Sequence, residues 1–125
     1  MYTITKEFHF SAAHALPSLP ASHKCHNLHG HNYTVILRLS GETLNEHGFV
    51  VDYAEMQPLK HLLDNVFDHK NLNEVEELGG TQTTAENLAF WLFGWCCSVW
   101  GNLVESVTVK ETEKTSATFK PSGRI

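Results

Sequence analysis

Two stretches in the first third of the chain alternate between polar and apolar residues. In residues 2–12 and again in residues 31–40, the large apolar side chains share one parity: Tyr2, Ile4, Phe8 and Phe10, then Tyr33, Val35, Leu37 and Leu39. A period of two is typical of a strand that is buried on one face only. Both stretches are therefore predicted to be strands whose apolar faces need cover from another layer.

The middle of the chain changes to the helical period. Asp52 and Glu55 form a helix-start signature, and Pro58 places the start of that helix near Glu55. Thr83 and Glu86 predict a capping box for a second helix, and Gly101 predicts its end. Apolar residues recur at helical spacing in both: Met56, Leu59, Leu62, Leu63, Val66 and Phe67, then Leu88, Leu92, Trp95, Cys96 and Val99.

The remaining segments complete the fold prediction. Leu103–Glu111 and Ser116–Phe119 are predicted strands, Phe49–Asp52 is a short apolar segment expected to extend the sheet, and residues 16–28, 41–48 and 68–80 are loops. The order strand, strand, helix, helix, strand, strand indicates an α+β fold with an antiparallel sheet. A chain of 125 residues and 14.1 kDa is the size of one domain, residues 1–125.

Charge and cysteine content exclude several classes of protein. Nine basic against 14 acidic residues give a net charge of −5, which is no footprint for nucleic acid and no polybasic membrane anchor. No apolar run approaches the roughly 20 residues that span a bilayer, and the start MYTITKEF is unlike a signal peptide. With three cysteines, two of them adjacent, a disulfide framework is not expected. These features predict a cytoplasmic protein with reduced thiols.

The chain has nine histidines, and six of them lie in its first quarter. His29 and His31 are two residues apart at the start of a predicted strand, so their imidazoles point to the same face. If the two N-terminal strands pair antiparallel, His14 meets them at one end of the sheet. Three nitrogen donors with an open fourth position are typical of a catalytic zinc rather than a structural one.

Four other residues are candidates for chemistry. Cys25 is either a fourth zinc ligand or an acid/base group beside the metal, although a free cysteine is most often inert and buried. Asp68 and His69 either end the first helix or form a pair that polarises a thiol or moves a proton. Glu111 is either a solvent-facing strand residue or a carboxylate that accepts two parallel N–H bonds from a planar ligand.

Other histidines, cysteines and tryptophans are interpreted as packing residues: His9, His47, His61, Trp91, Trp95, Cys96, Cys97 and Trp100.

Several motifs in order resemble those of one family, the 6-pyruvoyl-tetrahydropterin synthase and 6-carboxytetrahydropterin synthase group of the tunnelling-fold superfamily. The matching segments are FSAAH (Phe10–His14), HKC followed by HGH, GFVVDYAEM (Gly48–Met56), DHKNLN (Asp68–Asn73), TTAENLA (Thr83–Ala89) and KET (Lys110–Thr112). Phe119 is a departure, because relatives often carry tyrosine in the final strand.

The resemblance implies a fold, an assembly and a site. The fold is a four-stranded antiparallel sheet with two helices on one face, and chains assemble into trimers or hexamers whose sheets join into a barrel. The resemblance implies zinc on His14, His29 and His31 and a pterin anchored by Glu111. Cys25, Asp68 and His69 would form the catalytic acid/base set, with Asp68 and His69 able to serve the Cys25 of a neighbouring chain.

The resemblance also implies a reaction. Only three residues separate Cys25 from HGH, as in the 6-carboxytetrahydropterin branch, whereas the pyruvoyl-forming branch tends to have a longer insertion. The implied enzyme converts 7,8-dihydroneopterin triphosphate to 6-carboxy-5,6,7,8-tetrahydropterin, releasing acetaldehyde and triphosphate, on the route to queuosine and related deazapurines. Lys24 and Lys110 are candidates for binding the triphosphate. The alternatives are 6-pyruvoyl-tetrahydropterin synthase and a non-catalytic zinc-binding module in which Cys25 is the fourth ligand.

Overall fold

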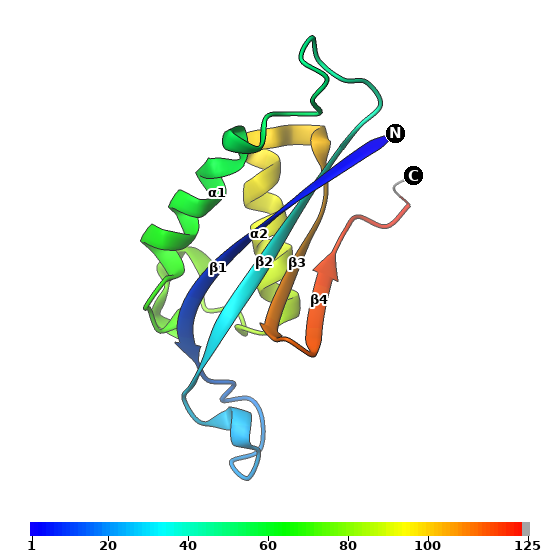
Figure 1. Cartoon of the computed structure of the whole chain (residues 1–125). Helices are drawn as coiled ribbons and strands as arrows, with labels where there is room; N and C mark the ends of the chain where they lie inside the picture. Colours follow the sequence, from blue (N-terminus) through cyan, green and yellow to red (C-terminus); the bar gives the residue numbers. More distant parts are fainter. Residues whose placement is uncertain (124–125) are drawn as a thin grey trace.

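The computed structural model describes residues 1–123 and contains one antiparallel sheet. Its strands are β1 (Tyr2–His14), β2 (His29–Gly41), β3 (Val104–Thr112) and β4 (Thr115–Phe119), in the spatial order β1-β2-β3-β4. The helices α1 (Gln57–Leu62) and α2 (Ala85–Trp100) cover one face of this sheet (Figure 1). The α+β fold with a four-stranded sheet is therefore confirmed.

The first helical region has three successive geometries. It starts with a 3-10 turn, Tyr53–Met56, and the predicted capping box is present: the Ala54 N–H donates to Asp52 and Glu55 accepts from the Asp52 N–H. Helix α1 follows, with Pro58 in its first turn, where the missing N–H needs no partner. A π-helical turn, Leu63–Phe67, ends the region. The proline thus opens α1 instead of interrupting it.

Helix α2 begins one residue later than the sequence predicts. Its N-cap is Thr84, whose hydroxyl accepts from the Asn87 N–H at 3.2 Å, so the predicted box of Thr83 and Glu86 is wrong. Gly101, with a φ of 58°, ends the helix as predicted. The buried stripe includes Phe93, while Val99 is exposed, contrary to prediction, because it lies on the solvent side of the last turn.

The core lies between the sheet and the two helices. Alternate strand residues fill it from the sheet side, as the period of two predicts: Phe8, Phe10 and Ala12 from β1, Tyr33, Val35, Leu37 and Leu39 from β2, and Val107 and Val109 from β3. Phe49–Asp52 does not extend the sheet, and Phe49 is 42% exposed. In residues 1–123, no helix combines the length and apolar character needed to cross a membrane.

Residues 68–71 run along the outer edge of β1. The Ser11 N–H donates to Oδ1 of Asp68 at 2.9 Å, the His69 N–H donates to the Ser11 carbonyl at 2.6 Å, and Ala13 forms a parallel bridge with Asn71. The rest of the predicted loop 68–80 contains two short 3-10 turns, Leu72–Glu74 and Glu76–Leu78. Backbone hydrogen bonds therefore hold this segment against the sheet without making it a strand.

Candidate functional site

Strand register brings three histidines together at one end of the sheet. His14 pairs directly with His29 across β1 and β2, and His31 is opposite Ala12. The side chains of all three point to the face that carries the helices, since they share the parity of the buried core residues. Their ligand atoms lie within 4.8 Å of one another, an arrangement that can hold a metal ion. We call His14, His29 and His31 the histidine trio.

Carbonyl groups behind two of the rings determine which nitrogen is available. Nδ1 of His14 lies 2.8 Å from the Thr83 carbonyl, and Nδ1 of His29 lies 2.7 Å from the Asn27 carbonyl. A carbonyl only accepts, so each Nδ1 carries the hydrogen and a neutral ring keeps its lone pair on Nε2. This is the support that metal-binding histidines usually have.

Nε2 of His14 is the atom that best tests whether a metal fits. It is buried and has no hydrogen-bond partner, which is unusual for a polar atom in a protein interior. A divalent ion bound by the trio would satisfy it. The donor set, three imidazoles with two oriented by carbonyls, matches the chemistry that zinc accepts in catalytic sites.

The electrostatics keep two of the rings neutral. Burial lowers the pKa of His14, and His29 and His31 lower it further, against an opposing effect of the Thr83 hydrogen bond. Burial also lowers the pKa of His31, while Glu111 acts in the opposite direction. A neutral imidazole is the form that binds a metal. The lowered pKa values of His14 and His31 therefore favour binding of a metal ion over binding of a proton.

Glu111 lies beside the trio. Its Oε2 is 3.3 Å from Nε2 of His14 and 3.7 Å from Nε2 of His31. Tyr33 shares this region: its ring contacts His31 edge-on, with centroids 5.5 Å apart, and its buried hydroxyl has no hydrogen-bond partner. Burial, with a smaller contribution from Glu111, raises the pKa of Tyr33 well above its ordinary value.

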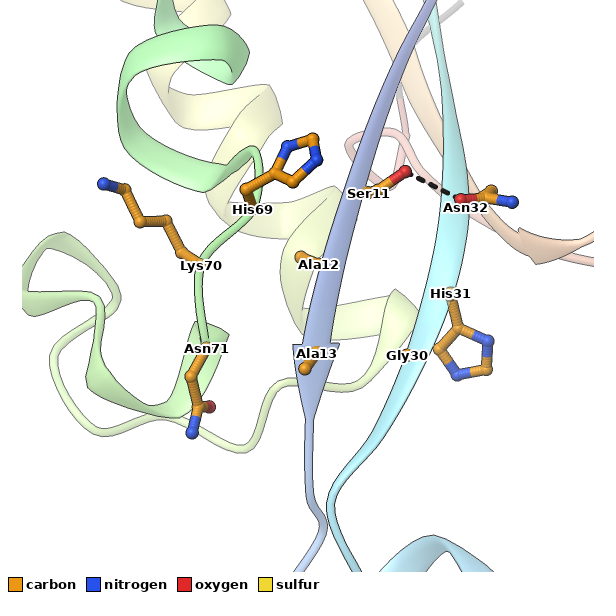
Figure 2. Close-up of a pocket in the computed structure, with 9 residues that line it drawn as sticks. All are labelled: Ser11, Ala12, Ala13, Gly30, His31, Asn32, His69, Lys70 and Asn71. Carbon is orange, nitrogen blue, oxygen red and sulfur yellow. Dashed lines mark hydrogen bonds between the residues drawn. The ribbon is translucent and has the colours of Figure 1, made fainter.

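Asp68 and His69 form a second, separate group. Oδ2 of Asp68 lies 2.8 Å from Nδ1 of His69, and the His69 side chain is 83% exposed. Hydrogen bonds from the Ser11 N–H and from His69 hold the pKa of Asp68 below its ordinary value. In Figure 2, His69 lies outside β1 while His31 points away on the far side of β2. His69 and His31 line the same pocket from its two sides, and neither Asp68 nor His69 belongs to the group of donor atoms that the trio forms.

Cys25 lies in the loop that joins β1 to β2 beyond the end of the sheet (Figure 1). The loop is held by its own backbone and histidines: the Leu16 N–H donates to the Cys25 carbonyl at 2.9 Å, and Nδ1 of His23 accepts from the Cys25 N–H at 3.0 Å. The thiol is half-buried. It is not one of the donor atoms in the cluster around the trio.

Sequence reasoning missed the residues that support the trio. Thr83 was assigned to helix capping, yet it is buried behind His14, where its carbonyl and hydroxyl both face Nδ1. Two successive threonines before one helix were the available signal, because only one of them can be the N-cap. The role of the Asn27 carbonyl had no sequence signal, because every residue has a backbone carbonyl.

Comparison with known proteins identifies the family. A family model described as 6-pyruvoyl tetrahydropterin synthase matches residues 3–122. The chain belongs to the 6-pyruvoyl tetrahydropterin synthase family. The structure of Caenorhabditis elegans 6-pyruvoyl tetrahydropterin synthase superposes with a TM-score of 0.84 at 35% identity, covering 97% of this chain and 96% of that one. The tunnelling fold implied by the motifs is thus confirmed.

Members of the 6-pyruvoyl tetrahydropterin synthase family similar to this chain carry two different activities in their names. The 6-carboxy-5,6,7,8-tetrahydropterin synthase of Synechocystis is 34% identical over 124 residues, covering 95% of this chain and 93% of the relative. The 6-pyruvoyl tetrahydrobiopterin synthase of Dictyostelium discoideum is 31% identical over 127 residues, covering 94% of each. Membership in the family makes this protein a pterin lyase, and the histidine trio is consistent with the metal site typical of that family.

Proposed function

We propose that this protein is a zinc-dependent 6-carboxy-5,6,7,8-tetrahydropterin synthase. It converts 7,8-dihydroneopterin triphosphate to 6-carboxy-5,6,7,8-tetrahydropterin and releases acetaldehyde and triphosphate, an early step towards queuosine and related deazapurines. The observation that carries the proposal is the convergence of three imidazoles with Nε2 of the buried His14 left unpartnered. The choice of product rests on the three residues, 26–28, between Cys25 and His29.

The histidine trio would hold the zinc through Nε2 atoms. When bound, zinc acts as a Lewis acid that stabilises negative charge developing on substrate oxygens. Thr83 and Asn27 keep the His14 and His29 rings in the orientation that this requires. The trio therefore supplies a preorganised set of donors, of which His14 is buried and the other two are half-buried.

Glu111 would recognise the pterin. The 2-amino group and N3–H of a pterin form a guanidine-like edge, and one carboxylate can accept both hydrogen bonds in parallel. Glu111 is suited to this because its side chain is 26% exposed and lies within 3.7 Å of two members of the trio. Recognition of the ring and the reacting side chain would thus occur next to each other. Lys24 and Lys110 are the proposed contacts for the triphosphate.

Cys25, His69 and Asp68 would move the protons. Nδ1–H of His69 donates a hydrogen bond to Asp68, so Nε2 of the same ring can accept a proton. The Asp68 carboxylate then stabilises the imidazolium that forms. Since His69 lies beside the outer edge of β1 and His31 lies on the far side of β2, we propose that this dyad serves the Cys25 of a neighbouring copy. The active enzyme would be a trimer or a hexamer, with sites between chains.

The second candidate is 6-pyruvoyl-tetrahydropterin synthase, which the Caenorhabditis elegans structure favours. That enzyme would use the same site to eliminate triphosphate and keep the two-carbon fragment. Incubation with 7,8-dihydroneopterin triphosphate, followed by assays for acetaldehyde and for the pterin product, distinguishes the two. Stoichiometric acetaldehyde supports our proposal, whereas a pyruvoyl product without acetaldehyde contradicts it.

A non-catalytic zinc-binding module is tested by Cys25→Ala. If Cys25 moves protons, the variant retains zinc and loses turnover. If Cys25 is a structural fourth ligand, the variant loses zinc or folding. Zinc content per chain and the melting temperature, measured beside turnover, separate these outcomes.

A further inference from the structure

Glu111 lies on the side of β3 that faces the histidine trio. It shares the parity of Val107 and Val109, both of which are fully buried under the helices. A strand alternates its side chains, so the carboxylate continues this row towards the end of the sheet where the trio lies. Its position beside the metal ligands is therefore a consequence of strand geometry.

Two distances match those of a fourth donor of a tetrahedral ion. Zinc lies about 2.0–2.2 Å from nitrogen and oxygen ligands, and tetrahedral angles then place two donor atoms about 3.4 Å apart. Oε2 of Glu111 is 3.3 Å from Nε2 of His14 and 3.7 Å from Nε2 of His31. One carboxylate oxygen thus has the separation from two imidazoles that a shared metal requires. Glu111 is outside the group of donor atoms that lie within 4.8 Å of one another, so its side chain has to move towards His29 to complete the tetrahedron.

A metal ion at this point would bind two groups that otherwise lack a partner for each other. Nδ1–H of His14 donates a hydrogen bond to the Thr83 carbonyl. Nε2 of the neutral ring therefore has its lone pair next to Oε2 of Glu111. Two acceptors that face each other at this distance repel, whereas a divalent ion between them attracts both. The same ion would satisfy Nε2 of His14, which has no hydrogen-bond partner.

We propose that Glu111 is the fourth ligand of the trio's metal in the substrate-free protein, and that the pterin displaces it. This inference rests on the metal site of the proposed function. A carboxylate that accepts two N–H bonds from a planar ring uses both of its oxygens, so binding of the pterin edge competes with coordination. Binding of the substrate would then free the fourth coordination position of the metal, next to which the side chain of the substrate reacts.

The test uses the assembled, metal-free protein loaded with zinc or with cobalt(II), whose visible spectrum reports its ligands. Glu111→Gln should weaken zinc binding by at least about 10-fold, since loss of even an outer-shell partner of a ligand has that effect, and should change the cobalt spectrum. Glu113→Gln is the matched control, because it removes a nearby exposed carboxylate of the same hairpin, and it should leave both unchanged. In the wild type, pterin itself should shift the cobalt spectrum towards that of Glu111→Gln. That measurement needs no variant.

The outcomes separate this inference from the proposed function. If the wild type binds zinc but Glu111→Gln has the same affinity and cobalt spectrum, the inference is wrong and the histidine site stands. A thiolate-to-cobalt absorption band that is lost in Cys25→Ala would show that Cys25 holds the fourth position, which also overturns the inference. If neither zinc nor cobalt binds, the metal site and the proposed function fail together.

Discussion

At the residue scale, the position of the hydrogen on the His14 ring decides which nitrogen can bind a metal: with the hydrogen on Nδ1, the lone pair is on Nε2. The Thr83 carbonyl holds this hydrogen, and burial favours the neutral ring. A site of this kind has to exclude protons as well as bind a metal, because protonation of Nε2 removes the lone pair. The free energy of unfolding of the metal-free protein should therefore depend on pH, because the fold keeps His14 neutral.

The first prediction concerns this pH dependence. The pKa of His14 and that of His31 lie below the ordinary value of about 6.5, so the unfolded chain binds more protons than the folded one beneath that pH. Stability of the metal-free protein should thus be highest above about pH 6.5 and fall as the pH decreases through the lowered pKa values. Each group contributes at most about 1.4 kcal/mol per pH unit. Urea unfolding in the presence of a chelator measures this.

His14→Asn provides the comparison, because asparagine can still donate to the Thr83 carbonyl but does not titrate. The fall in stability between pH 7 and pH 5 should be smaller in this variant than in the wild type. His47→Asn, which removes an exposed histidine from a surface loop, is the matched control. Identical profiles for wild type and His14→Asn would contradict the prediction.

The second prediction concerns the buried hydroxyl of Tyr33. Tyr33 stacks on Phe10, with ring centroids 4.6 Å apart, and its hydroxyl has no hydrogen-bond partner. A buried, unpaired hydroxyl costs about 1–3 kcal/mol, and phenylalanine keeps the stacked ring. Tyr33→Phe should therefore raise the free energy of unfolding of the metal-free protein by about 1 kcal/mol.

Chemical denaturation measures this change, with Tyr53→Phe as the control. Tyr53 is 55% exposed, so its hydroxyl is hydrated and its removal should change stability by less than about 0.5 kcal/mol. A loss of stability in Tyr33→Phe would show that the hydroxyl has a partner in solution.

At the element scale, segment 68–71 depends on one unusual backbone conformation. His69 has a φ of 60°, the only positive φ outside glycine among residues 1–123. Left-handed backbone is unfavourable for a residue with a Cβ and is retained mostly where function needs it. Here it lets the His69 N–H reach the Ser11 carbonyl while the side chain stays beside Asp68.

The third prediction separates this backbone strain from the function of the imidazole. Both His69→Gly and His69→Ala remove the ring, but only glycine adopts a positive φ at no steric cost. The glycine variant should be more stable than the alanine variant by about 0.5–1 kcal/mol, although glycine also gains freedom in the unfolded chain. Thermal unfolding of the two variants measures the difference.

Lys70 gives the matched control, because its φ is negative. There the order should reverse, with Lys70→Ala more stable than Lys70→Gly. An alanine variant at position 69 as stable as the glycine variant would show that the segment adopts another conformation in solution.

Contacts set by strand geometry could be predicted from the sequence, whereas contacts that depend on how separate segments pack could not. The trio was predictable because strand parity and an antiparallel pairing place His14 opposite His29 whatever the side chains around them. Thr83 was misassigned, because its burial behind His14 depends on how the segment before α2 packs. Phe49–Asp52 reads as a strand but has no neighbouring strand to pair with. The contact of Glu111 with the trio needed the register of β3, which no local pattern reveals.

At the scale of the whole molecule, the sheet of a single chain has two edges, β1 and β4. Residues 68–71 bond to β1 at Ser11 and Ala13, near the end of that strand. β4 is short, and the backbone groups on the outer side of an edge strand can pair with another strand. A second copy of the chain is the partner expected from the family resemblance, and this assembly would bring one chain's Asp68 and His69 to another chain's Cys25.

The fourth prediction is complementation between two inactive variants. Cys25→Ala and His69→Ala should each lose turnover, since each removes one member of the proposed acid/base set. If a site takes Cys25 from one chain and His69 from the next, mixing the variants and allowing subunits to exchange creates sites with both residues. Random mixing at equal amounts restores about a quarter of the sites, because each interface needs the correct variant on both sides.

Turnover of the mixture, measured before and after subunit exchange, tests this arrangement. A rise to about a quarter of wild-type activity requires that the residues come from different chains. Mixing Cys25→Ala with a double variant that lacks both residues should restore nothing, because no site then has an intact pair. An inactive mixture whose subunits have exchanged, as shown by mass spectrometry, would place Cys25 and His69 in the same chain's site. That result would require either that residues 68–71 leave the edge of β1, where Ser11 and Ala13 hold them, or that the loop with Cys25 moves towards them.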